Sequence, residues 1–111
     1  MATISNLYVD AGSTFSNIIT VSASNGAPLN LTGYTVASQM RKSYQSSVAY
    51  AFTASIYIAT AGKVRLQLTD EQSALIPAGR WLYDVEITSP TGVTTRVVEG
   101  IVTVNPQITQ I

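Results

Sequence analysis

The stretch "RWLYDVEITSPTG", residues 80–92, contains a strand and the turn that ends it. Trp81, Tyr83, Val85 and Ile87 recur at every second position, with Asp84 and Glu86 between the last three, which places this apolar row on one face of a β-strand. The following Ser-Pro-Thr-Gly fits a three-residue hairpin loop with Gly92 in a left-handed conformation. The stretch therefore predicts a half-buried strand that turns back into an antiparallel neighbour.

The same logic extends to the rest of the chain. The segment "KVRLQLT", residues 63–69, repeats the alternation, and turn residues punctuate the sequence at short intervals. Strands are predicted near 3–9, 14–22, 34–42, 49–58, 63–69, 80–88 and 93–104. Short, evenly spaced strands predict an all-β, Ig-like antiparallel β-sandwich of about seven strands.

Two connections are informative. In "GAPLNLTGYTVASQMRK", residues 26–42, Leu29 and Leu31 are two apart, so both can enter the core while the chain passes from one sheet to the other. Thr69 and Gln72 have capping-box spacing, which predicts one short helical turn near residues 70–75. We expect Leu75 to close the end of the sandwich.

The hairpin loop also sets a register. It pairs Glu86 with Arg96 as an exposed ion pair, and it places Glu99 on the core side. A β-bulge at Gly100 would turn Glu99 outward, so we expect one there.

Composition limits the function. The 111 residues predict a single domain, 1–111, with an extended tail from about 105. Six basic and six acidic residues give no net charge, which argues against nucleic-acid binding. There is no Cys or His, so thiolate chemistry and the usual catalytic triads are excluded. No apolar run suits a membrane span, and "MATISNLYVD" lacks signal-peptide features.

The acidic residues offer two alternatives to plain surface. Asp84 and Glu86 are spaced like paired carboxylates, but an exposed strand face explains them without a pocket. Asp70 and Glu71 might suggest calcium, but acids at a helix start are favoured by its dipole. We therefore expect no catalytic residue, no metal site and no cofactor, and we do not expect an enzyme.

Four segments together resemble a known family: residues 26–41, "GKVRLQLT" (62–69), "IPAGRWLYDV" (76–85) and "GVTTRVVEGIVTV" (92–104). They resemble small Ig-like β-sandwich modules of tailed-bacteriophage virions, among them the N-terminal module of siphophage baseplate upper proteins. Trp81 replaces the family's first aromatic residue, and Asn30 stands where Asp is commoner. The resemblance implies a structural role and names no catalytic residue.

Two uncharged parts of the chain, residues 43–62 and the C-terminal tail, are candidate contact surfaces. From Ser43 to Gly62 no residue is charged, although edge strands normally carry charges that block pairing. Arg and Tyr near this segment favour protein contact, with plain surface or glycan binding as alternatives. The uncharged tail either docks on a neighbour or is a free terminus. The candidate partner-contact residues are Tyr44, Tyr50, Ala51, Tyr57, Ile58, Ile108 and Ile111.

These observations lead to one expected function. We expect a virion structural protein, made in the host cytoplasm, that acts as an adaptor in the tail, baseplate or neck. Its partners would be other virion proteins and copies of itself, with no nucleic acid and no membrane. A capsid decoration protein and a receptor- or glycan-binding module are the alternatives.

Overall fold

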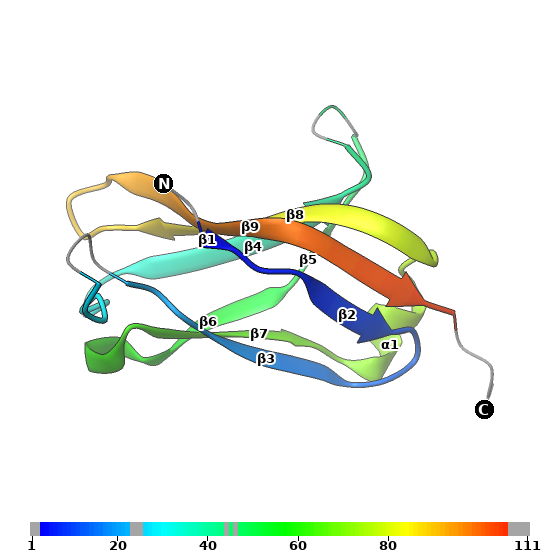
Figure 1. Ribbon diagram of the computed structural model, residues 1–111, viewed down its shortest axis with the longest axis horizontal. Helices are drawn as coiled ribbons and strands as arrows, with labels where there is room; N and C mark the ends of the chain where they lie inside the picture. The colour runs from blue at the N-terminus through cyan, green and yellow to red at the C-terminus, as the bar shows by residue number, and fades with distance from the viewer. Residues whose placement is uncertain (1–2, 23–25, 44, 46, 107–111) are drawn as a thin grey trace.

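The computed structural model describes residues 3–22, 26–43, 45 and 47–106, which form two stacked β-sheets (Figure 1). Its elements are β1 (Thr3–Ile4), β2 (Leu7–Asp10), β3 (Phe15–Thr20), β4 (Thr35–Arg41), β5 (Ala49–Ala51), β6 (Thr53–Ile58), η1 (Ala59–Ala61), β7 (Lys63–Leu68), α1 (Asp70–Ala74), β8 (Gly79–Thr88) and β9 (Thr94–Asn105).

The six-stranded sheet has the order β1-β9-β8-β4-β5, with β2 also lying along β9. The three-stranded sheet has the order β3-β7-β6. This arrangement confirms the predicted all-β sandwich. The N-terminal strands β1 and β2 run parallel to β9, whereas the other pairs are antiparallel. The sequence pattern had given no sign of this parallel pairing.

Two of the predicted strands are each divided in two. The strand predicted at 3–9 breaks at Ser5 and Asn6, between β1 and β2. The strand predicted at 49–58 breaks at Phe52, which is buried and donates its backbone N–H to the Ser38 carbonyl at 3.0 Å. Phe52 lies where the chain leaves the six-stranded sheet for the three-stranded one, so a continuous strand is impossible there.

The two alternating segments form the facing layers of the core, as predicted. Burying a large apolar side chain contributes about 1.5–3 kcal/mol relative to leaving it exposed, so these rows make a large contribution to the stability of the sandwich. The buried residues that they contribute are Val64, Leu66 and Leu68 from β7 and Trp81, Tyr83, Val85 and Ile87 from β8.

The connection between β3 and β4 passes from one sheet to the other, as expected. Leu31 is buried and Leu29 is half-buried against the core. The Leu31 N–H donates to the Ala59 carbonyl at 2.8 Å, which holds the segment against η1. The Asn30 side chain accepts from the Thr32 N–H at 3.0 Å and fixes the turn into β4.

The helical turn begins as predicted and ends differently. Thr69 and Gln72 form both hydrogen bonds of the capping box at the start of α1. Leu75, however, is 71% exposed, and Ile76 is the buried residue at 3%. Leu75 still has helical dihedrals as the C-cap, so the chain turns inward one residue later than expected.

The hairpin register is confirmed, but the bulge lies elsewhere. Glu86 pairs with Arg96 as predicted, and the next pair joins Val85 to Val98, so Val97 is the extra residue. The expected bulge at Gly100 was wrong. Glycine is needed there for a different reason, because a Cβ would collide with the Ser5 carbonyl of the β1–β2 link.

Candidate functional site

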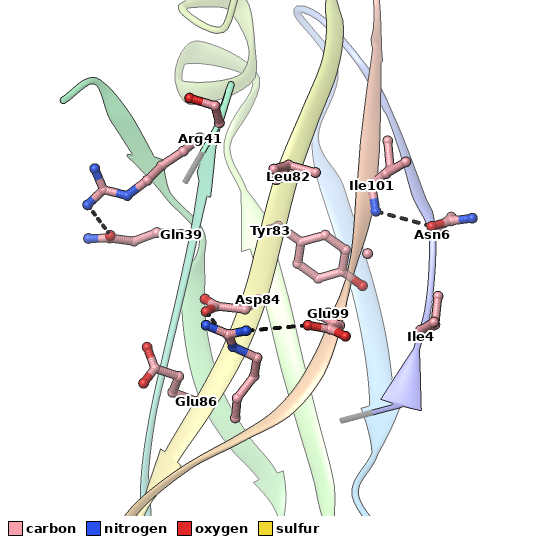
Figure 2. A pocket seen from close by; sticks show the side chains of 13 residues that line it. Ile4, Asn6, Gln39, Arg41, Leu82, Tyr83, Asp84, Glu86, Glu99 and Ile101 are labelled. Atoms are coloured by element: carbon pink, nitrogen blue, oxygen red, sulfur yellow. Dashed lines mark hydrogen bonds and ion pairs between the residues drawn. The ribbon is translucent and has the colours of Figure 1, made fainter. Parts of the chain in front are cut away.

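A shallow hollow of about 560 Å³ lies on the outer face of the six-stranded sheet. Residues from β1, β4, β8 and β9 line it, as Figure 2 shows. Leu82 and Ile101 form its apolar part, and Ile4 stands at its side with 73% of its surface exposed. The strand alternation explains the position, because these residues occupy the outward row opposite the core row.

Ionic groups occupy the other part of the hollow. Arg96 Nε lies 3.1 Å from Asp84 Oδ2, and Arg96 Nη1 lies 3.4 Å from Glu99 Oε2. The exposed ion pair that the sequence predicted between Arg96 and Glu86 is therefore absent, although the two residues are register partners. The guanidinium reaches the neighbouring carboxylates across the bulge instead. Glu86 has no ion pair with any residue that the structure describes.

Tyr83 connects the hollow to the core. Its ring packs edge-on against Phe52 with the centroids 6.0 Å apart, and its hydroxyl donates to the Ser5 carbonyl oxygen. Burial raises the pKa of the Tyr83 phenol above its ordinary value of 10.0. The phenol is thus a neutral donor that holds the β1–β2 link over Gly100, and this arrangement indicates a structural role.

The predicted contact segment forms an edge strand of each sheet, β5 in one and β6 in the other. Tyr57 and Ile58 on β6 are 46% and 41% exposed, and Ala51 on β5 is also exposed. Tyr50 behaves differently. Its half-buried ring packs edge-on against Trp81 at a centroid distance of 5.4 Å, so much of it belongs to the core.

The structure brings some predicted contact residues together and separates others. Tyr57 and Ile58 share one end of the three-stranded sheet, whereas Ala51 lies opposite Gln39 at the edge of the other sheet. Tyr44, Ile108 and Ile111 lie outside the described residues. Strand β9 ends at Asn105, and residues 107–111 of the expected tail lie outside the described residues.

The described part of the chain contains no group of three or more His, Cys, Asp or Glu side chains placed to hold a metal ion. None of its helices is long and apolar enough to cross a membrane.

Sequence reasoning missed the hollow and one further arrangement on the opposite sheet. There the Arg65 guanidinium stacks on the Tyr57 ring, with Cζ 4.1 Å from the centroid. Neither feature has a short sequence signature, because each joins residues from strands far apart in the chain. The only available signal was the outward row of each alternating strand, which also describes ordinary surface.

No protein-family model and no curated protein sequence matches the chain. Among solved structures, the sandwich is similar to one described as the N-terminal domain of phage TP901-1 ORF48. The TM-score is 0.59 at 15% sequence identity, and the match covers 91% of this chain and 85% of that one. At this identity the likeness establishes a shared fold.

Proposed function

We propose that this protein is a structural module of a bacteriophage particle, an adaptor in the tail, baseplate or neck that works through protein–protein contacts. One observation carries the proposal: nearly the whole chain shares its fold with nearly the whole of a phage protein domain. The motifs that resemble virion modules span the same region. The step from fold to function is an analogy, so it needs support from the surface.

The sheet edges supply that support. Strand edges present unpaired backbone groups, and proteins usually protect them with charge. Here β5, β6 and their connections lie within residues 43–62, which contain no charged residue. The exposed Tyr57 and Ile58 add apolar area to this edge. A neighbouring virion protein that covered the edge would remove an aggregation hazard and gain binding energy from the same surface.

Capsid decoration would use the same kinds of contact, and no observation favours it over the tail. Glycan binding would be favoured by a cluster of exposed aromatic rings beside polar groups. Among the described residues, Tyr8 lies on the outer face of the six-stranded sheet, Tyr50 packs on Trp81 and Tyr57 lies on the other sheet. These rings do not converge, so we propose contact with virion proteins.

The test adds charge to the edges. Ala51→Lys and Ile58→Lys should each reduce incorporation into particles, and removal of residues 107–111 should weaken it. Thr91→Lys at the exposed hairpin tip is the matched control and should leave incorporation unchanged. Thermal melts must show that all the variants remain folded. Normal incorporation of both edge variants and the truncated chain would contradict the proposal that these surfaces make the contacts.

A further inference from the structure

The outer face of the three-stranded sheet is basic. Its strands β3, β6 and β7 contain no Asp or Glu, and their two charged residues are Lys63 and Arg65. Both point outward, because Val64 and Leu66 between and after them fill the core. In a chain with no net charge, such a face requires a compensating excess of acid elsewhere.

The Arg65 side chain is held in place by a ring contact and forms no ion pair among the described residues. The stacking on Tyr57 fixes its guanidinium, and its register partner Ile18 lies beside it with 45% of its surface exposed. Arg65 Nε is buried and has no hydrogen-bond partner within the described chain. Lys63 Nζ donates to the Thr20 hydroxyl at 3.3 Å. Neither cation forms an ion pair among the described residues, so both charges can attract an external carboxylate.

The hollow on the opposite side of the molecule has the complementary character. It contains three carboxylates and two guanidinium groups, which leaves one negative charge in excess. Asp84 and Glu99 share Arg96, whereas Glu86 stands apart from these bonds in Figure 2. Leu82 and Ile101 provide an apolar floor beside the carboxylates. An incoming surface with cations beside exposed apolar groups would match this combination.

We propose that the basic face of one copy of this chain docks into the hollow of a second copy, with Arg65 and Lys63 directed at Glu86. Ile18 and Tyr57 would then meet the apolar floor. The two contacting surfaces differ and lie on opposite sides of the sandwich, so in a docked pair one copy keeps its hollow free and the other copy keeps its basic face free. Contacts of this head-to-tail kind repeat into a ring or an open stack.

This inference deepens the proposed function, and it rests on that function only for its place in a particle. The association itself can be measured with the purified chain alone. The absence of net charge favours it, because no long-range repulsion opposes the approach of copies.

The experiment is sedimentation velocity over a range of concentrations up to the millimolar range, at low and at high salt. The wild-type chain should form species larger than a monomer, and salt should weaken them. Arg65→Glu and Glu86→Lys should each weaken self-association by at least about tenfold. Lys63→Glu is a second variant of the basic face that leaves the Tyr57 stack intact. Arg80→Glu reverses an exposed charge outside the hollow and serves as the control.

The decisive sample is an equimolar mixture of the two charge-reversed variants. Each retains one surface that matches a surface of the other, so the mixture should regain assembly, as should the double variant Arg65→Glu/Glu86→Lys. A monomeric wild-type chain at every concentration would overturn the proposal. So would self-association that charge reversal and salt leave unchanged. Either result leaves the phage role intact, because incorporation into particles is measured separately.

Discussion

The indole nitrogen of Trp81 donates a hydrogen bond of 3.0 Å to the carbonyl oxygen of Pro77, and the indole ring is buried at the start of the core row of β8. The bond links that row to the loop that follows α1. Tyr50 packs on the edge of the ring, and Lys42 Nζ lies 4.7 Å from its centroid. Trp81 therefore links the core to the loop after α1, to β5 and to the residue that follows β4.

Trp81→Ala should reduce the free energy of unfolding by about 3–5 kcal/mol, because it removes a large core side chain and leaves a cavity. Trp81→Phe should cost less, since most of the apolar contact remains and the hydrogen bond is lost. Urea denaturation measures both values. Native fluorescence with the emission maximum of a water-exposed indole would contradict the burial on which this prediction depends.

The hairpin loop gives a second test. Gly92 has a φ of 91°, and a Cβ there would meet no atom within 4 Å, so its cost would come from the backbone alone. Gly92→Val should therefore destabilise the protein by about 1–2 kcal/mol. Thr91→Ala, at an exposed position in the same loop, should change stability by less than about 0.5 kcal/mol. Equal small effects in thermal melts would indicate another turn geometry.

Ser73 ties α1 to the turn between β2 and β3. Its buried hydroxyl accepts from the Gly12 N–H at 3.0 Å and donates to the Ser13 carbonyl at 2.8 Å. Ser73→Ala leaves these backbone groups without their partner and should cost about 1–3 kcal/mol. The exposed Ser16→Ala is the control and should be nearly neutral. Matching denaturation midpoints for the two variants would show that this bond contributes nothing.

The raised pKa of Tyr83 predicts that the wild-type chain loses part of its stability advantage over Tyr83→Phe at alkaline pH. Its folded pKa lies above 10.0, so the folded chain keeps a proton that the unfolded chain releases. The contribution of the protonated Tyr83 phenol to the free energy of unfolding is fully present below about pH 10 and is lost as pH rises through the folded pKa. Tyr83→Phe lacks this titration, although loss of the hydrogen bond to Ser5 should cost about 0.5–1.5 kcal/mol at neutral pH.

Denaturation of both proteins at neutral pH and above about pH 10 measures this effect. The gap between them should narrow as pH rises, because only the wild-type chain loses the Tyr83 contribution. A gap that stays constant through this range would mean that the phenol titrates alike in the folded and unfolded states.

Most of the fold was predictable from local sequence patterns. The alternation in β7 and β8 and the capping box at Thr69 depend on neighbours in the sequence, and all were predictable. The bulge at Val97 was not, because it depends on how β9 meets both β8 and the N-terminal strands. The burial of Ile76 in place of Leu75 likewise depends on the exact residue at which α1 ends.

The surfaces were predictable only in part. The missing charge between residues 43 and 62 is visible in the sequence, and β5 and β6 proved to be sheet edges. The burial of Tyr50 depends on the position of Trp81, thirty-one residues later, and no local rule contains it. The contact of Arg96 with Asp84 and Glu99 also depends on the bulge, so the composition of the hollow could not be read from spacing.

The proposal that this chain is part of a phage particle is tested most directly on the particles themselves. The experiment is to purify the particles released by cells that carry the gene and count the copies of this chain in each by quantitative mass spectrometry. We predict a fixed copy number per particle that survives density-gradient purification and high-salt washing. A chain that is expressed in those cells yet missing from the washed particles would contradict the claim.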